Sequence, residues 1–477
     1  MAILAQAFLF NWRQIDVASD LDRLRLVLSV IPDEPLMHVL EQERGQGRDE
    51  YPVRATWNTL LAGVVYQHPS VASLRRELRR NGQLRYLCGL DPLLGEDAVP
   101  TDSAYSNFLE ILMEHREEVR GMFDRLTDEL HRELPDLGRR LAVDGKALPS
   151  FGKPEKKTPA VGQATTPTAA ADQAQESRQK AAAEQEPDRR RDHDANWGVK
   201  SYRGKRPDGT AWEKVVTWFG FELHLLVDSQ HELPLNYKVT QASAPETVEL
   251  LPLVEETRGK HPEIIARAEE LAADKGYDSA ENNRRLYDDY GIRPFIDKRS
   301  DWKDRTDATR VLFADRCDTV VHDVRGTISC ICPATEEQRQ MAYWGFEPER
   351  GTLKYRCPAA AYDFQCQGRV QCPGAQTDYG KIVRIDIDTD RRMFTPVARD
   401  SAAWERAYDR RTAIERVNSR LDRVLGFEQH TIRGLKKMET RVGIALVVML
   451  AMALGRIRIG QQDQMRSLLA PVIRSAA

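Results

Sequence analysis

Three acidic residues of this chain stand where carboxylates can do chemistry. Asp144 in "LAVDGKAL" and Asp274 in "LAADKGYD" each follow small and apolar residues that predict a strand, and each is followed by a lysine and a glycine. Glu415 lies in a stretch with helical periodicity. Two acids held close together repel, and they stay ionised only with a cation between them. Because oxygen ligands suit Mg²⁺ or Mn²⁺, these residues predict a divalent metal site.

Each of these acids also has an ordinary structural explanation. An Asp at a strand end commonly caps a turn, and a Glu on a surface helix is usually solvated. The metal site therefore exists only if the fold gathers all three side chains. If one of them lies on the opposite side of the sheet, Asp228, which also ends a predicted strand, is the next candidate.

The stretch that carries Glu415 predicts one continuous helix over 404–427, since it has no Pro or Gly until Gly426. At 100° per residue, one face carries Tyr408, Arg411, Glu415, Asn418 and Asp422. Another face carries Ile414, Val417, Leu421, Val424 and Leu425. We therefore expect the helix to bury its apolar stripe and to present Tyr, Arg and Glu side chains from a different side.

The surrounding elements predict how the acids are positioned. Residues 1–135 have helical spacing of apolar residues, whereas strands dominate from 196 onward. Three antiparallel strands are followed by a helix, a strand ending at Asp274, a second helix and a fifth strand, "IRPFIDK". This is the order of an RNase H-like α/β fold, in which the first and fourth strands are neighbours. The ends of those strands would bring Asp144 and Asp274 side by side.

Changes in composition predict the domain boundaries. We expect a helical N-terminal domain at 1–138, a catalytic domain built from 139–299 and 396–458, a cysteine-containing insertion at 300–395 before the Glu415 helix, and a C-terminal tail at 459–477. Residues 152–191 have almost no large apolar side chains, so they predict a disordered insertion. The apolar run 442–454 is too short to span a bilayer comfortably and predicts a buried core helix.

Six of the seven cysteines lie between residues 317 and 372, whereas Cys88 stands alone. Such a cluster is consistent with a structural zinc site or with reduced cysteines in a core or on a surface. The preferred zinc set is Cys357, Cys366 and Cys372 with either Cys330 or Cys332, and His322 is a possible substitute. Zinc would hold together a small segment that lacks a core of its own.

Charge is nearly balanced, with 70 Lys and Arg against 73 Asp and Glu and a net charge of −3. An argument for nucleic-acid binding must therefore rest on local patches. The segment 71–85 holds Arg75, Arg76, Arg79, Arg80 and Arg85 against one acid. These arginines are consistent with a solvated helix face or with contacts to DNA phosphates. The sequence from 405 to 441 has ten Lys and Arg against six acids and predicts a second basic region.

Several motifs together resemble the DDE transposases of bacterial insertion sequences. Tyr408, Arg411 and Glu415 have the spacing that starts their Y-R-E-K signature, and "LAVDGKAL" and "ADKGYDSAENNRRL" resemble the segments with their two aspartates. "SLRRELRRNGQLRYLCGL" resembles part of their N-terminal helical domain. One position departs from the signature, because the Lys expected seven residues after Glu415 is Asp422. Arg420 and Arg423 are the candidates to supply that charge.

The resemblance implies a catalytic triad of Asp144, Asp274 and Glu415 that holds two Mg²⁺ or Mn²⁺ ions. It implies cleavage at the terminal inverted repeats of an element, strand transfer into target DNA, and a homodimer in the synaptic complex. By the same resemblance, Tyr408 and Arg411 hold a terminal phosphate near the break. A cytoplasmic, nucleoid-associated protein is expected. Two alternatives stay open, namely an inactive, domesticated DNA-binding derivative and a structure-specific nuclease of the same fold.

Overall fold

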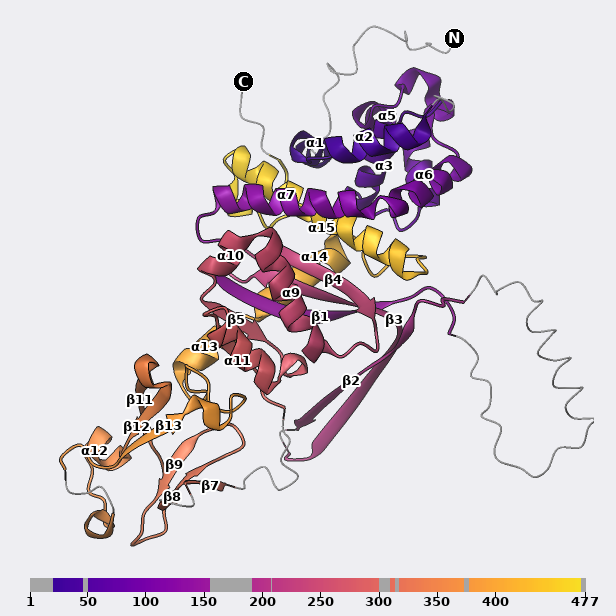
Figure 1. Ribbon diagram of the computed structural model, residues 1–477. Helices are drawn as coiled ribbons and strands as arrows, with labels where there is room; N and C mark the ends of the chain where they lie inside the picture. The colour runs from indigo at the N-terminus through magenta and orange to yellow at the C-terminus, as the bar shows by residue number, and fades with distance from the viewer. Residues whose placement is uncertain are drawn as a thin grey trace, which may run out of the picture.

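The computed structural model describes residues 20–45, 50–154, 191–206, 208–299, 309–313, 317–372 and 377–472. The predicted disordered insertion, 152–191, lies for the most part outside these described residues. Its two ends are described, and there Lys153 and Arg191 form an isolated parallel bridge. The chain is a mixed α/β protein whose helices and sheets follow the predicted order (Figure 1).

The N-terminal part is helical, as predicted. Its helices are α1 (Leu21–Val30), α2 (Glu34–Arg44), α3 (Val53–Val65), α4 (Val71–Arg80), α5 (Gly82–Cys88), α6 (Asp102–Glu114) and α7 (Arg116–Glu133), with a 3₁₀ segment η1 (Pro92–Ala98). Polar side chains start several of them. Ser70 accepts a hydrogen bond from the backbone N–H of Ser73 at the start of α4, and Thr101 accepts one from Ala104 at the start of α6.

The long helix α15 (Leu435–Arg458) joins the N-terminal helices to the rest of the molecule. It packs against α1 and α7 on one side and against β4 of the central sheet on the other (Figure 1). It is long and apolar enough to cross a membrane, but 89% of its most apolar window is buried inside the protein. The predicted buried core helix is therefore confirmed. One hydrophobic core runs from Leu24 through Val143 to Leu446, so the N-terminal helices and the sheet share it.

The central sheet has six strands. They are β1 (Arg140–Pro149), β2 (Asn196–Lys205), β3 (Ala211–Asp228), β4 (Leu233–Gln241), β5 (Glu270–Ala273) and β6 (Arg293–Ile296). The order is β2-β3-β1-β5-β6, and β4 pairs with the inner half of β3. β1 is antiparallel to β3 and parallel to β5, which in turn is parallel to β6. The outer half of β3 pairs with β2 as a ribbon that extends away from the sheet (Figure 1).

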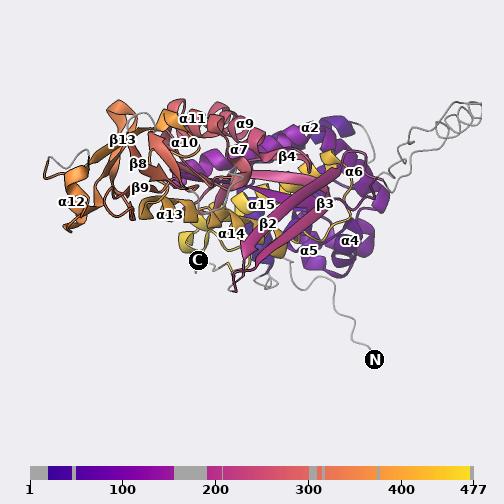
Figure 2. The same cartoon turned by 90° about the horizontal axis from the view of Figure 1, so that it is seen from below.

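Helices cover both faces of this sheet. α9 (Glu246–Lys260), α10 (Pro262–Arg267) and α11 (Ala280–Asp288) lie on one face, and α13 (Ala402–Asp409), α14 (Thr412–Val424) and α15 lie on the other (Figures 1 and 2). The apolar stripe predicted for the Glu415 helix is buried, since Ile414, Val417 and Leu421 are inaccessible to solvent. That stripe packs on β1 and β3, and it fixes α14 beside the strand that carries Asp144.

Residues between β6 and α13 form a lobe with its own core. Its elements are β7 (Arg310–Phe313), β8 (Cys317–His322), β9 (Ile328–Ile331), β10 (Gln338–Gln340), β11 (Ala342–Glu347), β12 (Thr352–Arg356), α12 (Pro358–Tyr362) and β13 (Ile382–Asp386). They form a four-stranded and a three-stranded sheet around buried residues such as Val320 and Tyr355. The lobe lies at the end of the molecule opposite the N-terminal helices (Figure 2). In the predicted tail, Met465 and Leu468 are instead buried in the main core.

Candidate active site

The two predicted aspartates lie side by side at one edge of the sheet. The parallel pairing of β1 with β5 ends at Val143 and Ala273, and the next residue in each strand is Asp144 and Asp274. The sequence predicts a strand that ends at Asp144, but β1 continues to Pro149 because it stays paired with β3. Only the parallel ladder ends there. The chain leaves β5 at Asp274, whose Oδ1 accepts a hydrogen bond of 2.7 Å from the N–H of Gly276.

Both aspartates have a raised pKa. Burial, followed by the neighbouring carboxylate of Asp274, raises the pKa of Asp144 to about 6. Burial, followed by the carboxylate of Glu246, raises the pKa of Asp274 above its ordinary value. Acids placed like this are costly to ionise together unless a positive charge lies near them. The pair therefore suits a bound cation with a preference for oxygen ligands.

The third predicted acid reaches this edge through an arginine. Arg411 Nη2 donates a hydrogen bond of 3.1 Å to Glu415 Oε1, and Arg411 Nη1 lies 3.7 Å from Asp144 Oδ2. The Glu415 side chain is 56% exposed, whereas that of Asp144 is 16% exposed. The Arg411 guanidinium thus stands between the strand carboxylate and the helix carboxylate.

The predicted metal-bridging cluster of three carboxylates is not formed in this structure. Among the residues that the structure describes, no three His, Cys, Asp or Glu side chains are grouped so that they could hold a metal ion. Instead, the Arg411 guanidinium lies between Asp144 and Glu415, where its positive charge opposes the repulsion of the two acids. Asp144 and Asp274 are neighbours, and Arg411 lies between Asp144 and Glu415.

The predicted continuous helix 404–427 is interrupted next to Arg411. α13 ends at Asp409 and α14 begins at Thr412. Between them the hydrogen bonds tighten to three-residue spacing, from Arg411 N–H to the Tyr408 carbonyl (2.9 Å) and from Ile414 N–H to the Arg411 carbonyl (3.0 Å). Arg411 lies at this interruption, with its Nη1 3.7 Å from Asp144 Oδ2.

Tyr408 lies next to Arg411 at this interruption. Its ring stacks on that of Trp404, with centroids 5.0 Å apart and an interplanar angle of 12°. The Arg411 guanidinium carbon is 5.7 Å from the centroid of the Tyr408 ring. Trp404 is buried against Phe295 of β6. The predicted pair of Tyr408 and Arg411 is therefore anchored to the sheet, next to the aspartates.

Asp422, which stands where the signature has a lysine, forms an ion pair with a lysine of β1. Lys146 Nζ on β1 lies 2.5 Å from Asp422 Oδ2, and both side chains are less than 20% exposed. Arg420 does not supply this charge, because it is 13% exposed and donates hydrogen bonds to the carbonyls of Glu232 and Arg466. Arg423 is exposed. A positive charge is thus present at this place, but it comes from the strand that carries Asp144.

Asp228, the reserve candidate, has a structural role. It is paired with Leu141, at the end of β1 away from Asp144, and it is inaccessible to solvent. Its carboxylate accepts hydrogen bonds from the N–H groups of Gly138 (2.9 Å) and His231 (2.5 Å). It therefore holds a turn and does not contribute to the site at Asp144.

A cluster that was not predicted from the sequence borders the two aspartates. Lys200 Nζ on β2 lies 2.9 Å from Glu222 Oε1 of β3 and 2.7 Å from Glu246 Oε1 at the first residue of α9. Burial raises the pKa of Glu222 to about 7 even though Lys200 acts in the opposite direction. A signal for this cluster was present in the sequence, because a glycine follows each aspartate, and both Gly145 and Gly276 lie against these carboxylates.

The arginines of α4 do not form one exposed face. Arg75 is 12% exposed, pairs with Asp102 and donates a hydrogen bond of 2.8 Å to the carbonyl of Pro100. Arg76, Arg79 and Arg80 are exposed, and Arg80 pairs with Glu77 on its own helix. The predicted role of Arg75 as a phosphate contact conflicts with its burial, whereas the other three are open to a ligand.

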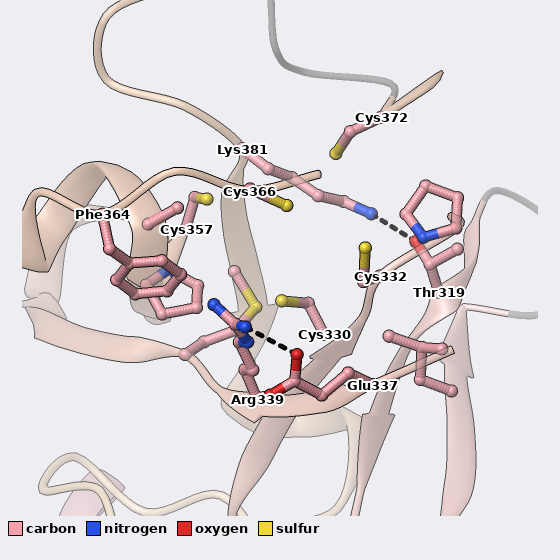
Figure 3. A pocket seen from close by; sticks show the side chains of 15 residues that line it. Thr319, Cys330, Cys332, Glu337, Arg339, Cys357, Phe364, Cys366, Cys372 and Lys381 are labelled. Carbon is pink, nitrogen blue, oxygen red and sulfur yellow. Dashed lines mark hydrogen bonds and ion pairs between the residues drawn. The ribbon is translucent and has the colours of Figure 1, made fainter. Parts of the chain in front are cut away.

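Five cysteines line one small cavity in the lobe between β6 and α13 (Figure 3). The cavity has a volume of about 30 Å³, and its thiols belong to Cys330, Cys332, Cys357, Cys366 and Cys372. Burial raises the pKa of Cys330 to about 11, whereas hydrogen bonds from the Thr335 hydroxyl and the Ala334 N–H lower that of Cys332 to about 7. His322 lies outside this lining, so it is not one of the side chains around the five thiols.

Comparison with protein-family models matches the chain over most of its length. Residues 139–451 match the model described as a transposase DDE domain. Residues 13–110 match the model described as a transposase domain (DUF772). A comparison with curated proteins finds no match. The first match contains Asp144, Asp274 and Glu415, and the second contains the arginines of α4.

Proposed function

Because the chain belongs to the family of transposases with a DDE domain, we propose that it binds the ends of its insertion sequence, cleaves a DNA strand there and joins that end to target DNA. One observation carries this proposal. Asp144 and Asp274 follow the last residues of a parallel strand pair, and the helix with Arg411 and Glu415 is packed beside them.

The sheet supports an RNase H-like catalytic domain. β1, β3 and β4 are antiparallel neighbours, and β5 and β6 extend the sheet in parallel beyond β1. We propose that residues 139–299 and 396–458 form this domain and that 300–395 is an insertion with its own core. Residues 1–138 would bind the element ends, although their helices share the main core with the sheet.

The residues at the site fit a divalent cation. Asp144 and Asp274 offer carboxylate oxygens, burial and neighbouring carboxylates raise the pKa of both, and Glu415 shares Arg411 with Asp144. A bound Mg²⁺ or Mn²⁺ pair would activate the attacking water or 3′-OH and stabilise the leaving oxygen. Arg411, released from Asp144 and Glu415, would then pair with the phosphate next to the break through its two-pronged guanidinium.

Incubating the protein with DNA that bears its element ends and with Mg²⁺ tests this function. Cleavage followed by joining to target DNA supports the transposase. Cleavage without joining favours the structure-specific nuclease, whereas binding without cleavage favours the domesticated derivative. We propose that a homodimer pairs the two element ends and that the protein acts in the cytoplasm, next to the nucleoid.

The exposed arginines of α4 are expected to add affinity for DNA without reading its sequence. Replacing Arg76, Arg79 and Arg80 with glutamine should flatten the salt dependence of binding by about one unit of log–log slope per lost phosphate contact. A salt titration of the affinity for end-bearing DNA measures this effect.

Arg75→Gln serves as the matched control on the same helix. Because Arg75 is held by Asp102 and Pro100, its replacement should lower thermal stability and leave the salt slope of DNA binding unchanged. If the triple variant keeps the full salt slope, the arginines of α4 are only a solvated helix face.

The cysteine cavity supports a structural zinc ion. Four thiolates satisfy a tetrahedral zinc site, and five thiols line this cavity (Figure 3). We propose Cys357, Cys366 and Cys372 with Cys330 as the ligands, and Cys332 as the alternative to Cys330. The side chains must turn toward one another to bind, because none of the described cysteines is yet grouped for a metal.

Removing zinc should loosen the lobe and spare the aspartates. After chelation, we expect faster hydrogen exchange in residues 309–395 and unchanged Mn²⁺ binding at Asp144 and Asp274. Comparing Cys330→Ser with Cys332→Ser identifies the fourth ligand, since only the ligand variant should lose zinc. Elemental analysis that finds no zinc in the native protein rejects this site.

A further inference from the structure

Lys200 makes three polar contacts at the edge of the active site. Its ammonium lies 2.9 Å from Glu222 Oε1 and 2.7 Å from Glu246 Oε1, and it donates a hydrogen bond of 2.9 Å to the carbonyl of Gly145. An ammonium has three N–H donors, so each donor of Lys200 has one of these partners. The Gly145 carbonyl belongs to the residue directly after Asp144. The buried cluster therefore holds the backbone that carries the first aspartate.

Glu246 also reaches the backbone behind the second aspartate. A Cβ atom added at Gly276 would lie 1.5 Å from Glu246 Oε2, and one added at Gly145 would lie 2.9 Å from Glu246 Oε1. Real Cβ atoms do not approach that closely. Glu246 thus lies against both glycines, between the β1 backbone after Asp144 and the turn after Asp274, and Glu222 also lies against Gly145.

The geometry points to Glu246 as a positioning residue of the active site, held in place by Lys200 and Glu222. It fixes the β1 backbone after Asp144 and the turn after Asp274, so that both aspartates present their oxygens to one bound metal. This inference rests on the proposed function and adds residues from β2, β3 and α9 to the machinery. Groups behind the direct ligands typically change metal affinity or activity by about 10- to 100-fold when they are replaced.

A buried ion cluster can also be simple packing, and the same helix offers a control for that explanation. Glu249, one turn further along α9, is 11% exposed, and its Oε2 lies 2.6 Å from Lys238 Nζ. Glu246 is 13% exposed and pairs with Lys200 at a similar distance. The two glutamates thus match in burial, pairing and helix, but only Glu246 lies against Gly145 and Gly276.

The test measures Mn²⁺ binding by calorimetry, together with cleavage of pre-bound DNA and thermal unfolding, on the full chain. Glu246→Gln should weaken Mn²⁺ binding about tenfold or more and slow cleavage, without weakening DNA binding. Glu249→Gln should bind Mn²⁺ as the wild type does. Lys200→Met should resemble Glu246→Gln, and Lys200→Arg, which keeps the charge, should recover most of the affinity.

Each outcome decides a separate question. If the Asp144→Asn variant binds as much Mn²⁺ as the wild type, or if the wild type binds none, the proposed function fails. If the wild type binds Mn²⁺ and Glu246→Gln binds it equally well, or if Glu249→Gln loses as much, the positioning role fails. If Glu246→Gln does not fold, Glu246→Asp tests the inference instead. Its side chain is one methylene shorter, so the carboxylate lies further from Gly145 and Gly276. Wild-type Mn²⁺ affinity in that variant overturns the inference.

Discussion

Replacing Asp144 or Asp274 with asparagine is expected to abolish strand cleavage while DNA binding survives. Metal-held charge stabilises the transition state by several kcal/mol, and each ~1.4 kcal/mol is tenfold in rate. We therefore expect losses of about a thousandfold or more for each aspartate, and a comparable loss for Glu415→Gln. Cleavage of end-bearing DNA and a gel-shift assay on the same samples separate the chemistry from binding.

The control for these variants is Glu405→Gln. Glu405 is an exposed acid on α13, close in sequence to the Tyr408–Arg411–Glu415 series, and it should retain full cleavage. Folding of the aspartate variants should survive, since each loses a charge from a site where like charges repel. If Glu415→Gln cleaves as well as the wild type, Glu415 is not the third metal ligand.

Much of the catalytic fold could be predicted from local patterns. The apolar runs before Asp144 and Asp274 predict strands, and the order of strands and helices predicts an RNase H-like sheet in which these two strands are neighbours. The buried stripe of Ile414, Val417 and Leu421 follows from helical periodicity alone. These features depend on residues close together in sequence.

The features that could not be predicted depend on contacts between distant residues. Lys146 and Asp422 are separated by 276 positions, and Arg411, between α13 and α14, meets Asp144 of β1 from a distant part of the chain. The interruption at Arg411 has no Pro or Gly to predict it. It arises where α13 is anchored by Trp404 and α14 by its apolar stripe, so packing on the sheet decides it.

Arg411→Ala is expected to depress cleavage by roughly 10²–10³-fold and to leave most DNA binding intact. An arginine aimed at developing charge contributes on that scale, whereas the loss of one phosphate contact flattens the salt slope by only about one unit. Arg411→Lys keeps the charge but loses the planar two-pronged donor set, so it should recover only part of the rate. Single-turnover cleavage of pre-bound DNA measures the effect.

Metal binding should move in the opposite direction in the same variant. In this structure Arg411 occupies the space between Asp144 and Glu415, so a bound metal must displace it. Without the guanidinium, that displacement costs nothing, and Mn²⁺ should bind about two- to fivefold more tightly, as expected for a partly exposed ion pair. A merely structural Arg411 would instead weaken both cleavage and Mn²⁺ binding. Tighter metal binding together with slower cleavage would thus show that Arg411 leaves the two carboxylates when metal binds and then pairs with the DNA phosphate.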